Sequence, residues 1–522
     1  MKREILPSLF LITAVVLERV MVSSGQIGIG QSLRVLLISL LFIIAISFVL
    51  QNFINDWRQV GFVALLAPIM FVAYRALYRV VKIGFPHLAT ILGVGLIVLL
   101  GLFYVLMSRQ VWRSIRNPSL VIAYLNLVCL ILLIFQIVRI GGEGYAFFKN
   151  TRFSDTATSP EPERSITLTK TASPDIYVII LDGYARQDVL DEIYNFDNSE
   201  FISSLEDRGF YVAGDSHSNY VQTPYTMASF WNFDYLPIWN SPYEYERYLY
   251  QPIQDNRAYH LLDEIGYVTV SMEGAVHYTE IRDSDIYLSK FLPLNDFETL
   301  LLIDSPLEPL SNIFDLGLPL QTYKVHRERL YYQLEMLGKV PAEIESPKIV
   351  YTHLLLPHPP FVFDERGQPQ EIEGTFSLAE GPGFQGGIDE YVKGYRAQVK
   401  IISEEVVKVI DAILAESEMP PVIVVMGDHG PASMFNFTVD NPGCIWERTS
   451  SLYAILLPGQ KERNLLYSSI SPVNTFRVIF DAYFGADLPL LEDRSYLRYW
   501  QQPTLNVDVT SLKDSRNGCV QP

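Results

Sequence analysis

The sequence predicts an N-terminal α-helical transmembrane bundle of about five spans, followed by an α/β domain with a largely parallel central sheet. Apolar stretches gather at the front of the 522-residue chain, and beyond residue 173 short β-branched runs alternate with helical patterns. The charge divides in the same way. Residues 1–150 carry 13 Lys and Arg against 4 Asp and Glu, whereas the remaining residues carry 27 against 54. We therefore expect a transmembrane region (1–140), a linker (141–173) and a soluble domain (174–522).

Five apolar stretches indicate the membrane spans, at about residues 5–23, 35–50, 60–74, 88–107 and 119–138. Each is near the roughly 17–25 residues that cross a bilayer. Lys and Arg are divided almost evenly between the two ends of these helices, so loop charge does not set the orientation. An odd number of spans places the soluble domain on the side opposite the N-terminus. The prediction is a multi-pass protein of the plasma membrane with an extracytoplasmic soluble domain.

The linker is expected to be a tether, because Thr151–Ser173 is rich in Ser, Thr, Pro and charge and has no helical or strand period. The acidic balance of the soluble domain excludes nucleic acid as a partner, since phosphate backbones are bound by clustered Lys and Arg. The three cysteines have no zinc-ligand spacing. Cys444 and Cys519 could bridge in an oxidising compartment, but the sequence leaves this open.

Four β-branched runs are predicted to be sheet strands: Ile176–Leu181, Tyr267–Ser271, Ile349–Tyr351 and Val422–Met426. Apolar residues at helical spacing predict a helix over Tyr391–Val409. Each run ends in polar residues. Ligands of open α/β sheets bind beyond the carboxyl ends of the strands. We therefore expect Asp182, Asp428 and His429 to converge, although they lie far apart in the sequence.

These three residues are predicted to hold one divalent cation, Zn²⁺, Mn²⁺ or Mg²⁺. The carboxylates supply charge, the imidazole sets the geometry, and Gly430 lets the backbone turn sharply. A single Asp-Gly pair is more often an ordinary turn. Several such strand ends in one domain favour the metal site instead.

Thr223 is the candidate nucleophile. Thr223-Pro224 is typical of a helix start, with Thr at the N-cap and Pro at the first helical position. A hydroxyl at this place lies at the positive end of the helix dipole, and a bound cation would activate it further. From the local sequence alone, a plain helix cap is the simpler interpretation, and Thr226 is a rival hydroxyl.

The order of these motifs resembles the sulfatase-like branch of the alkaline phosphatase superfamily. The strand ending in Asp182–Arg186 comes first, then Tyr220–Thr223, then His353–His358, and then Gly427–Gly430. The chain looks closest to lipoteichoic acid synthase-like and phosphoethanolamine transferase-like membrane proteins, which also join about five spans to a sulfatase/alkaline-phosphatase-like domain. The resemblance covers most of residues 174–480.

The resemblance implies that Asp182, Asp428 and His429 are metal ligands and that Thr223 is the metal-bound nucleophile. It also implies that His358 contacts the substrate or the leaving group.

Two further residues are substrate-binding candidates by the same resemblance. His353 is a weaker second histidine, for which a core histidine at a strand end is an equal alternative. Arg186 is the second candidate and is the last residue of the Asp182–Arg186 motif.

Two departures from the family pattern bear on the reaction. Sulfatases need Pro and Arg where this chain has Tyr225 and Met227, which disfavours sulfate-ester hydrolysis. The transferase-like proteins have Glu where this chain has Asp182, a feature that resembles phosphodiesterases.

The resemblance thus implies a metal-dependent enzyme that transfers a phosphorylated head group from a membrane lipid donor to an envelope polymer or glycan acceptor. The reaction would pass through a phospho-threonine intermediate. One alternative is a hydrolase of phosphodiesters or, with less support, of sulfate esters. Another is a catalytically dead binding or sensing domain, against which the retention of Asp182, Thr223, Asp428 and His429 argues.

Overall fold

The computed structural model describes residues 3–22, 29–153, 168, 173–237, 251–292, 294, 296–314, 316, 318, 322–370, 376–438, 440–460, 465–499 and 502–519. The chain forms two compact units. The first comprises Met1–Arg164 and Phe291–Leu320, and the second comprises Ser165–Lys290 and Gln321–Pro522. The second unit is called the catalytic unit below, and the first the membrane unit.

The membrane unit contains a helix over each of the five predicted stretches: α1 (Leu6–Val22), α2 (Ile29–Gln51), α3 (Trp57–Gly84), α4 (Ala89–Ser114) and α5 (Pro118–Phe153). Among the described residues, four segments, within α2 to α5, are long and apolar enough to cross a membrane. The remaining predicted span, α1, has 17 residues and lies at the lower limit of bilayer-crossing length.

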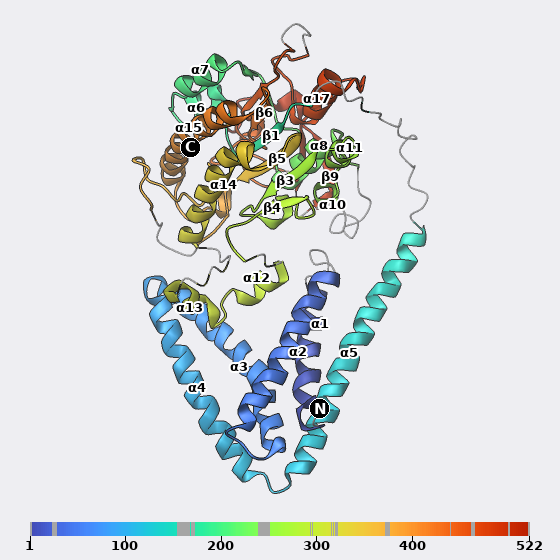
Figure 1. Ribbon diagram of the computed structural model, residues 1–522. Helices are drawn as coiled ribbons and strands as arrows, with labels where there is room; N and C mark the ends of the chain where they lie inside the picture. The colour runs from blue at the N-terminus through green and yellow to red at the C-terminus, as the bar shows by residue number, and fades with distance from the viewer. Residues whose placement is uncertain are drawn as a thin grey trace. The chain divides into compact units, whose positions relative to one another are not determined.

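The division of the chain differs from the predicted one at two places. The helix α5 continues to Phe153, past residue 141 where the linker was expected to begin, and most of the predicted tether lies outside the described residues. The segment 291–320, expected within the soluble domain, belongs to the membrane unit. It carries α12 (Asp296–Leu302) and α13 (Leu307–Phe314), which pack against α2 and α4 (Figure 1).

The catalytic unit is built on a sheet of seven described strands in the order β2-β7-β6-β1-β5-β3-β4. The strands are β1 (Ile176–Leu181), β2 (Tyr211–Val212), β3 (Val268–Met272), β4 (Ile286–Leu288), β5 (Lys348–Leu354), β6 (Val422–Met426) and β7 (Tyr453–Leu456). Strands β6, β1, β5, β3 and β4 are parallel, and β7 and β2 join antiparallel at one edge. The four predicted strands are the neighbouring strands β6, β1, β5 and β3, so the largely parallel sheet is confirmed.

Helices cover both faces of this sheet (Figure 1). Every residue of β1 is buried, as expected of a parallel strand covered on both sides. One set of its alternate side chains packs with α6 (Gln187–Glu192), α7 (Ser199–Asp207), α14 (Tyr323–Glu343) and α15 (Ile388–Glu416). The other set packs with α8 (Thr223–Asn232), α10 (Gln251–Gln254), α11 (Arg257–Glu264) and α17 (Thr475–Phe484).

The C-terminal segment is attached to the catalytic unit by a covalent link. This segment follows the antiparallel strand pair β8 (Tyr496–Tyr499) and β9 (Gln502–Asp508). Cys519 then forms a disulfide with Cys444, which lies just before α16 (Ile445–Thr449) and 75 residues earlier in the chain. The sequence had left this pairing open.

Candidate metal centre and active site

The register of the central strands brings the first two predicted ligands together. Ile180 of β1 pairs with Met426 of β6, so Asp182 and Asp428 both lie two residues beyond the same level of the sheet. The amide nitrogen of Gly183 donates to Asp428 Oδ1 at 3.1 Å. Gly183 has a φ of +74°, a conformation that costs glycine little and that other residues rarely adopt. The turn after β1 therefore aims the Gly183 amide at the neighbouring strand end.

Each of these two carboxylates has one oxygen held by the protein and one oxygen that is not. Asp182 Oδ2 lies 3.0 Å from His353 Nε2, and Asp428 Oδ1 accepts from Gly183. Asp182 Oδ1 and Asp428 Oδ2 are buried and accept no hydrogen bond from the residues that the structure describes. Buried carboxylate oxygens without donors are costly, and a bound cation removes that cost.

His429 completes the convergence. Its Nδ1 lies 3.0 Å from the Gly430 carbonyl oxygen and donates to it, which leaves Nε2 as the ligand atom. Nε2 lies 3.0 Å from Thr223 Oγ1, 3.3 Å from Asp428 Oδ2 and 3.8 Å from Asp182 Oδ1. The four predicted ligands therefore face one point.

The local backbone and the local charge both suit His429 to this role. A Cβ at Gly430 would lie 2.0 Å from the Glu447 carbonyl oxygen, so glycine is required here for close approach. Burial and the nearby Arg448 guanidinium lower the pKa of His429. The imidazole is therefore neutral, which metal binding requires.

Thr223 is the first residue of α8, and Gln222 occupies the N-cap position. The prediction that Thr223 caps the helix is therefore off by one residue. The Thr223 hydroxyl points to His429 Nε2 instead of to its own helix. The rival hydroxyl of Thr226 is buried and donates to the Tyr220 carbonyl oxygen at 3.0 Å. Only the first of these two hydroxyls lines the pocket described next.

A pocket of about 460 Å³ opens beside the four ligands, and its lining includes Asp182, Thr223, His358, Glu380, His429 and Arg448. His358 Nδ1 lies 2.6 Å from the Pro359 carbonyl oxygen, and its Nε2 lies 3.6 Å from Glu380 Oε2. Burial opposes a charge on this ring, but Asp182 and Glu380 raise the pKa of His358 to about 9. Burial likewise opposes the charge on Asp182, yet the histidines around it, His358 first, lower its pKa to about 2. The pocket thus pairs a protonated imidazole with an ionised carboxylate.

Glu380 and Arg448 are site residues that the sequence analysis missed. Two nitrogens of the buried Arg448 guanidinium contact Glu380 at 2.9 and 2.7 Å, and Nη2 lies 3.2 Å from His429 Nε2. Burial opposes ionisation of Glu380, but Arg448 and His358 hold its pKa well below the usual range. Glu380 precedes a Gly-Pro-Gly loop and Arg448 lies in the short helix α16, so neither follows a predicted strand.

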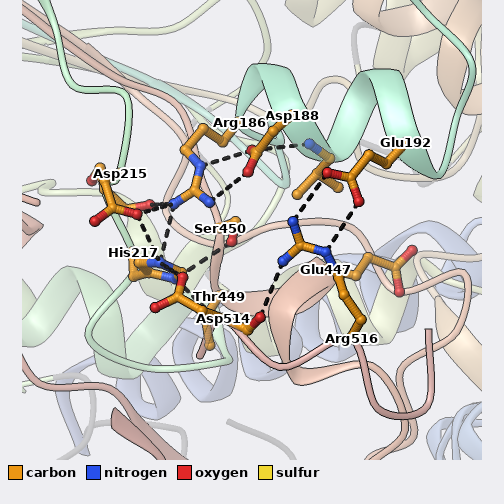
Figure 2. Close-up of polar contacts among 12 residues, drawn as sticks. Arg186, Asp188, Glu192, Asp215, His217, Glu447, Thr449, Ser450, Asp514 and Arg516 are labelled. Atoms are coloured by element: carbon orange, nitrogen blue, oxygen red, sulfur yellow. Dashed lines mark hydrogen bonds and ion pairs between the residues drawn. The ribbon is translucent and has the colours of Figure 1, made fainter. Parts of the chain in front are cut away.

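His353 and Arg186, the two substrate-binding candidates, do not line this pocket. His353 lies behind Asp182, and its backbone carbonyl accepts from Gln333 Nε2 at 3.0 Å. Asp182, His353 and Asp428 offer ligand atoms within 4.8 Å of one another, so His353 is placed to orient or to share a metal ligand. Arg186 turns away, toward Asp188, Asp215 and His217 (Figure 2).

Asp215, His217 and Asp514 form a second group with metal-ligand spacing. Here Arg186 Nη1 lies 3.0 Å from His217 Nε2 and 3.6 Å from Asp215 Oδ1 (Figure 2). Burial and the Arg186 charge lower the pKa of His217 to about 2. The guanidinium already provides the positive charge, so this group does not fit a metal ion. The group around Asp182 does.

Comparison with known proteins found similar solved structures at low identity. No protein-family model matches the chain, and no curated protein does. Similar structures include the C-terminal periplasmic domain of EcEptC from Escherichia coli (12% identity, 70% of this chain and 100% of that one, TM-score 0.47). They also include the integral membrane lipooligosaccharide phosphoethanolamine transferase A from Neisseria meningitidis (13%, 92% and 95%, 0.41). A putative sulfatase from Bacteroides thetaiotaomicron is a third (12%, 63% and 78%, 0.39).

Proposed function

We propose that the chain is a membrane-bound, metal-dependent phosphotransferase of the sulfatase-like branch of the alkaline phosphatase superfamily. It moves a phosphorylated head group from a membrane lipid to an envelope polymer or glycan acceptor. One observation carries this proposal. The Thr223 hydroxyl lines the pocket 3.0 Å from His429 Nε2, beside two buried carboxylates, Asp182 and Asp428, that each offer an oxygen to which no described residue donates.

Asp182, Asp428, His429 and Thr223 would hold one divalent cation. Such an ion supplies the charge that activates a hydroxyl and stabilises phosphoryl oxygens. These ligands do not choose among Zn²⁺, Mn²⁺ and Mg²⁺.

The transfer then takes place in two successive displacements at phosphorus. Thr223 enters and leaves this cycle as its alkoxide, the form that a bound cation would favour. Its Oγ1 forms a bond to the phosphorus while the bond from phosphorus to the lipid oxygen breaks. His358 gives its proton to that leaving oxygen. In the second displacement the acceptor oxygen bonds to the phosphorus, the bond to Thr223 breaks, and His358 takes the acceptor proton.

Arg448 is the pocket cation placed to receive the phosphoryl oxygens. Its guanidinium is planar and permanently charged, which suits bidentate contact with a phosphate group. Glu380 holds the guanidinium through two contacts and also faces His358. A single carboxylate thereby positions both the phosphate ligand and the proton donor.

An extracytoplasmic catalytic unit is part of the proposal. Disulfides persist in oxidising compartments, and Cys444 and Cys519 form one. Helices long and apolar enough to cross a membrane precede the catalytic unit, so a lipid donor is within reach of a tethered enzyme.

A phosphodiester hydrolase with the same intermediate is the second candidate. The observation that favours it is Asp182, where the transferase-like proteins have Glu. The two candidates differ only in whether water or an acceptor hydroxyl resolves the phospho-threonine.

The test is to trap the intermediate in the full chain, reconstituted in vesicles of phosphatidylethanolamine and phosphatidylglycerol. After acid quenching, mass spectrometry of the peptide around Thr223 should show the added mass of the phosphorylated head group. Turnover of bis(p-nitrophenyl) phosphate provides a soluble readout, and p-nitrophenyl sulfate tests for sulfatase activity.

Thr226→Ala is the matched control, because its hydroxyl lies three residues on and bonds to a backbone carbonyl. The adduct should persist in Thr226→Ala and vanish in Thr223→Ala. An adduct on another residue, or none in an enzyme that turns over, would overturn the mechanism. Release of free phosphorylated head group at the rate of lipid consumption would favour the hydrolase.

A further inference from the structure

The helix α13 in the membrane unit buries polar residues and exposes apolar ones, which is the reverse of a helix on a water-facing surface. Its buried residues are Glu308, Pro309 and Ser311. Its exposed residues include Leu307, Ile313 and Phe314, with 44%, 52% and 67% of their surface accessible. A helix in contact with water normally buries its apolar stripe and exposes its charges.

The buried polar face of α13 and of the turn before it is matched by cations at the end of α3. Lys82 Nζ lies 3.1 Å from Asp304 Oδ1 and 2.8 Å from Glu308 Oε1. Arg79 Nε donates to Asp304 Oδ2 at 3.0 Å. The Asp304 amide in turn donates to Glu308 Oε2 at 2.7 Å. The two carboxylates are buried because these partners hold them there.

The neighbouring helix α12 is attached in the same way at the start of α2. Glu298 is buried and forms an ion pair with Arg34. Leu301 packs with Val16 and Val35, which joins α12 to the contact between α1 and α2.

Contacts with α4 place α13 at this same end of the bundle. A Cβ at Gly93 would lie 3.1 Å from the Pro309 side chain, so the two helices approach closely at this glycine. Asn312 Nδ2 lies 3.4 Å from Thr90 Oγ1. The contact points are the start of α2, the end of α3 and the start of α4, which successive antiparallel helices bring to one side of the membrane.

We propose that α12 and α13 form an interfacial element whose outward apolar face lies in the lipid, at the boundary between head groups and acyl chains. This face consists of Leu307, Ile313, Phe314 and Leu316. The start of α4, the helix against which α13 packs, also exposes apolar side chains: Leu88, at its N-cap, and Ile91 are 51% and 70% accessible. An amphipathic helix with charges at the head-group level and aromatic and aliphatic side chains below it is suited to this depth.

Lipid is the partner that fits both the charged contacts of α13 and its exposed apolar face. The charged partners of α13 lie at helix ends, where head groups are found, and the apolar face extends a surface that membrane helices present to acyl chains. The segment between Lys290 and Gln321 thus gives the catalytic unit a second attachment to the bilayer, besides the chain that follows α5. This inference concerns where the protein meets the membrane and is independent of the chemistry of the pocket.

The test places an environment-sensitive nitrobenzoxadiazole label on α13 in the full chain. Phe314→Cys and Ile313→Cys are made separately in a Cys129→Ser background, with the disulfide retained, and reconstituted in phosphatidylcholine–phosphatidylglycerol vesicles. Lys339→Cys, at an exposed position of α14 in the catalytic unit, is the matched control. Spin-labelled lipids with the nitroxide high on the acyl chain should quench the α13 labels at least about twofold more than the control. Aqueous iodide should quench in the reverse order.

Two results would overturn the proposal. Iodide quenching at 313 and 314 equal to that at 339 would show that the face meets water. Protection from both iodide and spin-labelled lipid would show that protein covers it, either the catalytic unit or a second copy of the chain. The two label sites keep the test valid if one variant fails to fold, because both side chains are exposed.

Discussion

Two groups in the catalytic unit combine carboxylates with a histidine at metal-ligand spacing, and they differ in burial and in whether an arginine already lies among them. In the first group Asp182 and Asp428 are buried, and each keeps one oxygen that no described residue hydrogen-bonds. In the second group the Asp215 and Asp514 side chains are 50% and 60% exposed, and Arg186 lies among them. The residue types are the same. What distinguishes a metal site is burial together with unfilled acceptor atoms.

The second group has a different task, which its neighbours reveal. Asp514 belongs to the C-terminal segment, where Arg516 pairs with Glu192 (Figure 2). In the same segment Cys519 forms the disulfide with Cys444. Arg186 follows the end of β1, so this group attaches the C-terminal segment next to the turn that carries Asp182. We interpret it as a structural clasp.

The largest effect is expected at Thr223, the proposed nucleophile. Thr223→Ala should lower turnover of bis(p-nitrophenyl) phosphate by at least about 10³-fold, because the rival hydroxyl of Thr226 bonds to the Tyr220 carbonyl and does not line the pocket. Thr226→Ala should stay within about threefold of the parent, since its hydroxyl serves a local hydrogen bond. The reverse pattern would show that the wrong threonine was chosen.

Metal content should separate the two groups directly. Asp182→Asn and Asp428→Asn should weaken metal binding by more than the roughly 10–100-fold typical of changes to outer-shell partners. Asp215→Asn and Asp514→Asn should retain one ion per chain. Elemental analysis after dialysis against a limiting chelator provides the measurement. Loss of the ion from Asp514→Asn would contradict the conclusion that the second group does not bind metal.

The strand pattern made much of this site predictable. Asp182, Asp428 and His429 each follow a continuous β-branched run, and parallel strands deliver their carboxyl ends to one edge whatever their separation in sequence. The helix start at Thr223 was predicted from its local sequence, although the helix begins one residue earlier than expected, and only the family resemblance pointed to Thr223 as the nucleophile. Each of these residues is marked by its local sequence, and the topology of the sheet brings the marked residues together.

Glu380 and Arg448 were missed because nothing local marks them. One precedes a loop and the other lies in a five-residue helix, and their contact depends on how those segments pack. Segment 291–320 was missed for a related reason. Its apolar residues have helical spacing, and the sequence does not show that the charged face is the buried one.

Replacement of the pocket cation should have an intermediate effect. Arg448→Lys keeps the charge but loses the fork that contacts Glu380 and that we propose contacts the phosphate, so kcat/KM should fall by about 10–100-fold. Glu380→Gln should lower activity at high pH more than at low pH, because Glu380 helps to raise the pKa of His358. A matched control is Arg516→Lys in the C-terminal segment, where the arginine pairs with Glu192, and for this variant activity should not change.

The smallest effect is expected for the clasp itself. Asp514 is largely exposed, so its ion pair is screened by water, and Asp514→Asn should cost less than about 1 kcal/mol of stability. Replacing Cys444 and Cys519 by Ala should cost more, about 2–4 kcal/mol, because that link closes a long loop. Thermal unfolding of the full chain in detergent would rank the two. A chelator should lower the melting temperature of the parent and of Asp514→Asn equally, since the ion is bound elsewhere. If Asp514→Asn removed the response to chelator, the metal would belong to the clasp, and the roles assigned to the two groups would have to be exchanged.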